Sequence, residues 1–413
     1  MAKPSSTEWN RRKAALLDLF TRRAHQAEPY ECGAVTAEAV ELLGLRDGQL
    51  FLTDLPQRLL VRVAPSGEAA ETLPIEGTIA GRAFTTNTIA AAHDEDTHRL
   101  WVPVVDGADR LGVIGLTAGD TDDEDLRSAC ASLAHLIASL VLSKSLTGDA
   151  LPLVRRRQPL TLAAELRWSM LPPLTCASPR IGIAGVLEPA YEIAGDSFDY
   201  ALNPGTAHVA IFDAVGHGLS ASRLVNLALG SYRHSRRHGL DLAGSYHAMD
   251  DTIVEEFGDA GFVTAQLATI SLDTGRLQWL NAGHPRPLLL RGVAASMLEG
   301  DVCLPAGLSG IARRPGWTAD VCETQLEPGD QLLFYSDGVT EARSPIGDEF
   351  GTDRLGDLLV RSAAAGYSPA ETVRRLTRAV LDHQNDRLQD DATMVLVCWQ
   401  KDGGPTPEDP PLP

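Results

Sequence analysis

The stretch LLFYSDGVTEA, residues 332–342, joins four consecutive apolar or aromatic side chains to an aspartate and a glycine. Residues 332–335 predict a buried strand, and Asp337 stands directly before Gly338 just beyond its end. A carboxylate at the mouth of an apolar strand costs free energy unless a donor or a cation is paired with it. The stretch therefore predicts a partner for Asp337 elsewhere in the chain.

Three further stretches place aspartates beside small residues at the ends of apolar runs. They are YEIAGDSFDY (191–200), HVAIFDAVGHGLSAS (208–222) and RLQDDATMVLV (387–397), and they supply Asp196, Asp199, Asp213, Asp390 and Asp391. Each aspartate alone is equally well explained as a turn former or a helix cap. Taken together, at the ends of short buried strands, they indicate that these strand ends converge.

Converging carboxylates imply a bound cation, because like charges in a small volume repel strongly. The six cysteines are scattered without short paired spacing, so neither a zinc site nor a disulfide framework is indicated. Oxygen ligands favour Mg²⁺ or Mn²⁺ over Zn²⁺. Two such ions bridged by carboxylates activate a water molecule and neutralise charge in phosphoryl transfer, so Asp337 is predicted to face metal.

Five stretches in fixed order identify a family resemblance. They are AGDSFDY, DAVGHGLSAS, TAQLATISLDTGRLQWLNAGHPRPLLL, LEPGDQLLFYSDGVTEARSPIGDEFG and DDATMVLV. Over about residues 160–398 the chain resembles the SpoIIE-like branch of the metal-dependent (PPM-type) serine/threonine protein phosphatases. The resemblance implies an α/β (α+β) fold: an α-β-β-α sandwich of two antiparallel sheets flanked by helices, with two metal ions at one edge between the sheets.

The resemblance also implies which residues act. The catalytic metal ligands correspond to Asp196, Asp213, Asp337 and Asp390, together with the backbone carbonyl of Ala214. Ala194 and Ala214 stand where the family commonly has glycine, and a carbonyl ligand needs no particular side chain. Asp391 is expected beside the ligands rather than on the metal.

Three further candidates lie near these motifs. His217 and His284 stand in glycine turns, where they would orient ligands or water, or serve as core or turn residues. Arg286 is a candidate phosphate contact, with an ordinary surface position as the alternative. No cofactor other than Mn²⁺ or Mg²⁺ is expected.

The N-terminal half resembles a GAF domain over about residues 20–145, most visibly in LPIEGTIAGRAFTTN (73–87) and LWVPVVDGADRLGVIGLTAG (100–119). The second of these stretches predicts a hairpin with residues 106–108 in its turn. The resemblance implies a sensor domain whose input, a small molecule or a protein, the sequence does not identify. His93 and His98 are expected in a solvated loop rather than as haem ligands.

Composition shifts divide the chain into four predicted segments: a GAF-like sensor domain with flanking helices at 1–147, a linker with a regulatory amphipathic helix at 148–175, the phosphatase domain at 176–400 and a disordered tail at 401–413. The amphipathic helix LTLAAELRWSMLPP (160–173) corresponds to the segment that couples sensors to metal-site assembly in the family. An ordinary linker helix is the alternative.

Residues 121–146 predict a long helix whose apolar positions fall close to a heptad, at 126, 130, 133, 137, 140 and 141. Two interpretations remain open: a helix that closes its own domain, or the seam of a parallel homodimer. The net charge of −19 gives no attraction to nucleic acid or an anionic membrane. With no evident signal peptide and no obvious membrane span, the chain is expected to be cytoplasmic.

The sequence therefore predicts a protein phosphatase that hydrolyses phosphoserine or phosphothreonine by direct attack of metal-activated water. The resemblance makes a phosphorylated STAS-type anti-sigma-factor antagonist the expected partner, with a role in sigma-factor signalling. One alternative is a catalytically silent pseudophosphatase that only binds its partner, which the four intact aspartates disfavour. The other is a phosphohydrolase of small molecules, although the chain has no P-loop to cradle a nucleotide triphosphate.

Overall fold

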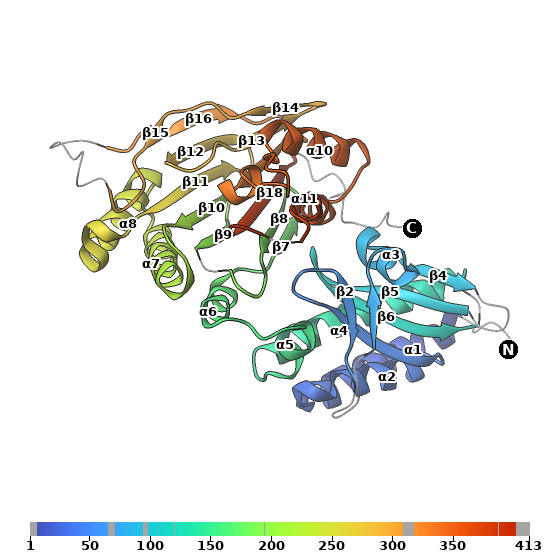
Figure 1. The fold of residues 1–413 in the computed structure, drawn as a ribbon. Coiled ribbons are helices and arrows are strands. Elements are labelled where there is room, and N and C mark those ends of the chain that lie inside the picture. The colour runs from blue at the N-terminus through green and yellow to red at the C-terminus, as the bar shows by residue number, and fades with distance from the viewer. Residues whose placement is uncertain are drawn as a thin grey trace. The chain divides into compact units, whose positions relative to one another are not determined.

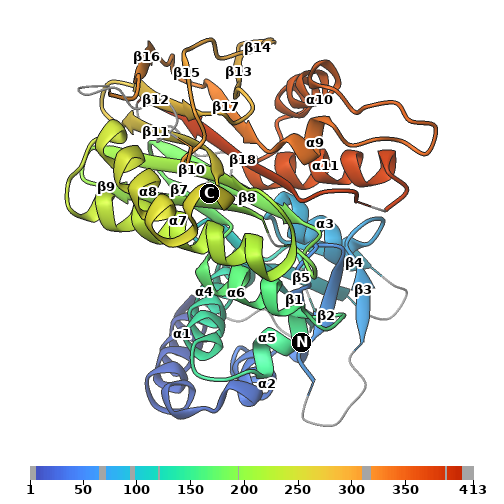
Figure 2. The ribbon, with the colours of Figure 1, turned by 60° about the vertical axis from the view of Figure 1, so that its left-hand side comes forward.

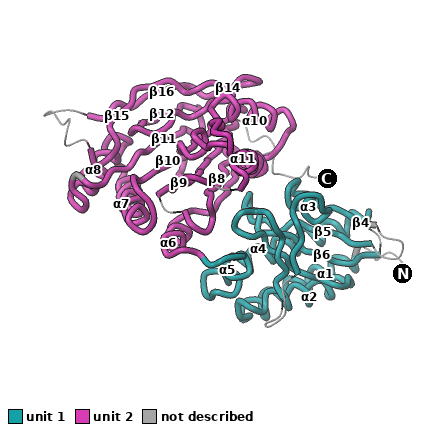
Figure 3. The backbone as a smooth tube through the Cα atoms, viewed as in Figure 1, with its two compact units in different colours: residues 1–159, 412–413 teal, residues 160–411 magenta. Residues whose placement is uncertain are grey.

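In a computed structural model the chain forms two compact units, Met1–Pro159 and Leu160–Pro411, which are coloured separately in Figure 3. The structure describes residues 6–64, 71–93, 98–119, 121–193, 195–308, 318–386 and 388–401. Ala194, the side chain of His93 and residues 402–413 of the predicted tail lie outside the described residues. The two units are described separately below.

The first unit is built on a six-stranded antiparallel sheet in the order β3-β2-β1-β6-β5-β4. Its strands are β1 (Arg46–Thr53), β2 (Leu59–Arg62), β3 (Thr72–Pro74), β4 (Ala90–His93), β5 (His98–Asp106) and β6 (Asp109–Ala118). The hairpin predicted over residues 100–119 is confirmed, because β5 and β6 pair as far as Asp106 and Asp109. Gly107 occupies the turn with a φ of 58°, a conformation that glycine adopts without strain.

Helices cover both faces of this sheet. The elements are α1 (Ser6–Leu19), η1 (Phe20–Ala24), η2 (Pro29–Glu31), α2 (Cys32–Leu42), α3 (Ile79–Thr86), α4 (Glu124–Ser145) and α5 (Ala150–Arg155). Apolar side chains of α1, α2 and α4 share one core with the sheet. On the other side, Phe84 of α3 joins Phe51 and Trp101 in a second cluster.

The helix α4 closes the first unit. All six near-heptad positions, from Leu126 to Val141, are buried in the core of this unit. This burial favours a helix that closes its own domain. By length and composition, α4 is also the one described helix apolar enough to cross a membrane, so the expectation that no segment approaches a membrane span is wrong by that measure. Half of its apolar window is buried, as in the core helix of a folded domain.

The second unit contains two six-stranded sheets. The β10 sheet has the order β15-β12-β11-β10-β9, with β16 also paired to β12, and the β17 sheet has the order β14-β13-β17-β18-β8-β7. The β10 sheet comprises β9 (Asp196–Asn203), β10 (Thr206–Ala214), β11 (Val263–Ser271), β12 (Arg276–Ala282), β15 (Val302–Cys303) and β16 (Cys322–Gln325). The β17 sheet comprises β7 (Thr175–Ser178), β8 (Ile181–Glu188), β13 (Leu288–Arg291), β14 (Ala294–Met297), β17 (Gln331–Tyr335) and β18 (Ala392–Trp399).

The two sheets pack face to face between layers of helices. Inward side chains such as Phe198, Ile211 and Phe334 form the core between the sheets. Figures 1 and 2 show α7 (Gly218–Arg237) and α8 (Leu242–Phe257) on the outer face of the β10 sheet, and α10 (Thr352–Ala364) and α11 (Pro369–His383) on that of the β17 sheet. The unit also contains α6 (Leu162–Met170), η3 (Gly258–Ala260) and α9 (Asp337–Thr340). The predicted α-β-β-α sandwich is confirmed.

Candidate metal centre

The register of β9 and β10 brings the first two predicted ligands together. Asp196 and Asp213 are directly paired across these antiparallel strands. Side chains alternate along a strand, so Asp196 shares the inward face of β9 with Phe198, and Asp213 shares that of β10 with Ile211. Both carboxylates therefore stand at one edge of the space between the sheets.

The end of β17 approaches the same edge from the opposite sheet. After the inward Phe334, the two-residue period also points Ser336 inward, and its hydroxyl donates a 2.6 Å hydrogen bond to Oδ2 of Asp196. The backbone N–H of Thr393 donates to the same hydroxyl oxygen at 2.9 Å. Ser336 was not among the predicted site residues, although the alternation of β17 is a signal that points to it.

The segment before β18 ties the two sheets together. Oδ2 of Asp391 accepts hydrogen bonds from the backbone N–H groups of Gly195, at 2.8 Å, and Asp196, at 3.3 Å. Asp390 accepts from the backbone N–H of Asp391 at 2.8 Å. Asp391 thus holds the start of β9 in place, while Asp390 lies at the edge of the same segment.

The Asp-Gly sequence of residues 337–338 has a steric explanation. A side-chain Cβ at Gly338 would lie 2.0 Å from the carbonyl oxygen of Asp391, closer than any real contact. A Cβ at Gly195 would lie 2.9 Å from the carbonyl oxygen of Ala214. Glycine at these two positions therefore lets the main-chain segments that carry the carboxylates approach each other.

The carboxylates perturb one another. Burial first, and then the charges of Asp213 and Asp391, raise the pKa of Asp196 well above its ordinary value. Burial and the charges of Asp337, Asp390 and Asp391 raise the pKa of Asp213 to about 7. The pKa of Asp337 is raised by burial and by Asp390. Asp213 therefore interacts with each of the other four aspartates, and it is the centre of the cluster.

This donor set fits a hard divalent cation. Every convergent side chain offers carboxylate oxygen, and the Ala214 carbonyl borders the same edge beside Gly195. In the described part of the chain, however, no three His, Cys, Asp or Glu side chains are already arranged to hold an ion. The carboxylates gather at one edge without closing around a common point.

The structure does not bring the three remaining candidates into this cluster. His217 is the exposed N-cap residue of α7, and its side chain makes no capping hydrogen bond. His284 is buried, its Nδ1 lies 2.8 Å from the Thr264 hydroxyl, and burial lowers its pKa to about 3. Arg286 forms an ion pair with Glu299. These contacts are those of a turn residue, a core residue and a surface residue.

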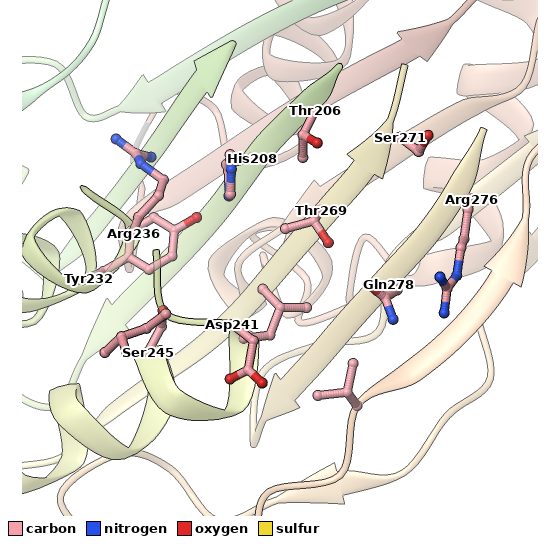
Figure 4. A pocket seen from close by; sticks show the side chains of 13 residues that line it. Thr206, His208, Tyr232, Arg236, Asp241, Ser245, Thr269, Ser271, Arg276 and Gln278 are labelled. Carbon is pink, nitrogen blue, oxygen red and sulfur yellow. The ribbon is translucent and has the colours of Figure 1, made fainter. Parts of the chain in front are cut away.

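A polar pocket lies at the far end of the β10 sheet. Its volume is about 400 Å³, and it lies on the outer face near the start of β10 and the turn between α7 and α8. The labelled side chains of Figure 4 include Thr206, His208, Thr269, Ser271 and Gln278 from the strands. None of the predicted site residues lines it, so this pocket is separate from the carboxylate cluster.

Comparisons with known proteins bear on the second unit. Residues 203–400 match the family model described as Stage II sporulation protein E (SpoIIE). Protein IcfG of Synechocystis is 25% identical over 244 residues, which cover 52% of this chain and 37% of IcfG. Phosphoserine phosphatase RsbU of Bacillus subtilis is 24% identical over 243 residues, which cover 57% of this chain and 68% of RsbU. The chain thus spans well under half the length of IcfG.

One of the solved structures similar to this chain contains two domains. The RsbU and RsbW domains of Rv1364c from Mycobacterium tuberculosis align with a TM-score of 0.48 and 24% identity, covering 57% of this chain and 64% of that one. The sequence similarity therefore relates the second unit to proteins that include a phosphoserine phosphatase. The match to the SpoIIE family model lies within the second unit and covers slightly less than half of the chain.

Proposed function

We propose that this chain is a metal-dependent protein phosphatase that removes phosphate from serine or threonine of a partner protein. The observation that supports this most is the group of aspartates at the edge between the sheets, where burial and neighbouring carboxylates raise the pKa of Asp196, Asp213 and Asp337. A protein keeps such repulsion in place when a cation relieves it.

The proposed ligands are Asp196, Asp213, Asp337, Asp390 and the carbonyl of Ala214. Two Mn²⁺ or Mg²⁺ ions held there would supply an activated water and neutralise charge on the transferring phosphoryl group. Ser336 fixes the Asp196 carboxylate by its hydrogen bond, and Asp391 fixes the backbone at residues 195 and 196. These two residues orient the site rather than take part in the reaction.

The proposed partner is a phosphorylated STAS-type anti-sigma-factor antagonist in the cytoplasm, which would make the chain a regulator of sigma-factor signalling. The similarity to RsbU, named a phosphoserine phosphatase, supports this choice. We further propose that residues 1–147 form a GAF-like sensor with a small-molecule or protein input. The segment 148–175 would join this sensor to the phosphatase domain at 176–400.

The test is phosphate release by the purified full chain from a panel of phosphoserine STAS proteins, with Mn²⁺, with Mg²⁺ and with excess chelator. Wild-type protein is expected to release phosphate only with metal, and Asp337→Asn is expected to release none. Arg378→Gln removes an exposed arginine paired with Asp382 on α11, so it serves as a surface control with full activity. Turnover that persists in chelator contradicts the proposal.

Two other outcomes identify the alternatives. Tight binding of a phosphorylated partner without release of phosphate, at saturating Mn²⁺, would indicate a pseudophosphatase. Rapid hydrolysis of a small phosphate ester, with every phosphoprotein left intact, would indicate a phosphohydrolase of small molecules.

A further inference from the structure

A completely buried arginine lies on α6, the helix that begins the second unit. The helix spans Leu162–Met170, and the Thr161 side chain caps it by accepting from the N–H of Ala164 at 3.1 Å. Arg167 on this helix is 0% exposed. A guanidinium that is fully removed from water is costly unless nearby groups compensate its charge.

The hydrogen bonds of Arg167 connect three elements. Its Nη1 donates to the hydroxyl of Ser197 on β9 at 3.0 Å, and its Nη2 donates to the carbonyl of Ser222 on α7 at 3.5 Å. The Ser222 hydroxyl in turn donates to the carbonyl of Ala163 on α6 at 3.3 Å. Arg167 thus fixes α6 against α7 and against the residue that follows Asp196.

The charges that compensate Arg167 are those of the metal centre. Burial lowers its pKa to about 10, and Asp196 and Asp391 are the carboxylates that oppose this fall. Among the described residues of this unit, Arg374 is also buried and has its own partner, since it donates to both oxygens of Glu371 at 2.9 Å. Arg167 differs because its charge is balanced by carboxylates that belong to another site.

We propose that Arg167 is a positioning residue for the metal centre. Through Ser197 it holds the start of β9, so that the neighbouring Asp196 presents its carboxylate inward at the edge between the sheets. This inference rests on the proposed function, because it assumes that Asp196 binds a cation. Within the helix that the sequence marked as regulatory, it assigns this role to one residue, Arg167.

A positioning role and a purely electrostatic role predict opposite signs for metal affinity. A fixed positive charge near the ligands repels a cation, so its removal alone would tighten metal binding. Loss of an orienting contact behind a ligand typically weakens metal binding by about 10- to 100-fold. The direction of the change therefore decides between the two roles.

The experiment is calorimetric titration of the full chain with Mn²⁺ in the absence of substrate. Arg167→Met keeps an unbranched apolar side chain and removes the charge and the donors, and it is expected to weaken Mn²⁺ binding about 10- to 100-fold. The Mn²⁺ affinity of Arg167→Lys is expected to lie between those of Arg167→Met and wild type. The matched control is Arg374→Met, which removes a buried arginine in α11, 8% exposed, and is expected to destabilise the fold without changing Mn²⁺ affinity.

Unchanged or tighter Mn²⁺ binding by folded Arg167→Met overturns the inference. Should that variant fail to fold, Ser197→Ala tests the same contact from its other end, and unchanged Mn²⁺ affinity in Ser197→Ala overturns the inference equally. If wild-type protein itself binds no Mn²⁺, the proposed function fails along with the inference. If wild-type protein and every variant bind Mn²⁺ equally well, only the positioning role of Arg167 is excluded, and the proposed function stands.

Discussion

Two aspartates on β9, three residues apart, occupy opposite faces of the strand and have opposite surroundings. On the outer face, Asp199 accepts from Arg233 at 2.7 Å and from Arg236 at 2.8 Å. On the inner face, Asp196 accepts from Ser336 and faces further carboxylates. Both aspartates are 1% exposed, so burial alone does not separate a structural carboxylate from a functional one. The sign of the neighbouring charges does.

The largest expected effect is on the inner cluster. Asp213→Asn removes a proposed ligand, so kcat is expected to fall on the order of 1000-fold, because the activated nucleophile is lost. The same variant in chelator is expected to melt at a higher temperature than wild type, because one of several repelling charges is gone. Phosphate release and calorimetric melting check the two parts. An Asp213→Asn protein that stays active and melts at a lower temperature than wild type would contradict the contrast between the two faces of β9.

The next effect concerns the outer face. Asp199→Asn leaves two largely buried arginines without their counter-charge, and it is expected to lower the free energy of unfolding by about 3–5 kcal/mol. Below its melting transition the variant is expected to keep wild-type Mn²⁺ affinity. Urea denaturation and metal titration measure these quantities. Weaker Mn²⁺ binding without loss of stability would assign Asp199 to the metal centre.

A third effect links metal to pH. In the metal-free protein the pKa of Asp213 is raised to about 7, above its unfolded value, so its contribution to stability is present at low pH and is lost as the pH rises through about 7. Mn²⁺ relieves the same repulsion, and at 100 times its Kd it is expected to raise Tm by roughly 5–10 °C at pH 8. The shift is expected to be smaller at pH 5, where protons compete. Scanning calorimetry at both pH values provides the test, and an equal shift would exclude proton competition.

The smallest expected effect is at Arg286, which forms an ion pair with Glu299. Arg286→Ala is expected to change stability by no more than about 0.5 kcal/mol and to leave KM for a phosphoprotein unchanged, as for a surface side chain. Steady-state kinetics decide the point. A rise in KM with kcat intact would restore the hypothesis that Arg286 contacts the phosphate of the substrate.

The sandwich was implied by the family resemblance, whereas the convergence of the aspartates was predicted from the residues for a physical reason. Strand periodicity and the polar residue at each strand end are local signals, so Asp196, Asp213 and Asp337 could be assigned to one edge. Ser336 and Arg167 were missed because their partners lie 140 and 30 residues away. In the local sequence, Arg167 is one polar position of an amphipathic helix, and nothing there indicates that it is buried.

The near-heptad of α4 shows the complementary limit. The same apolar spacing fits a helix that closes its domain and a helix that meets a second copy, because both bury one stripe. Only the sheet packed against the stripe decides between them. In the first unit, that sheet and its neighbouring helices bury all six positions.

The two glycines beside the carboxylates make it possible to separate geometry from charge. At Gly338 a single methyl group would meet the Asp391 carbonyl at 2.0 Å, so the main-chain segments there would have to move apart. A Gly338→Ala protein would still contain all five acidic side chains and the same overall charge. It would therefore be an inert reference molecule, identical in composition at every acidic position, in which only the spacing of the backbone has changed.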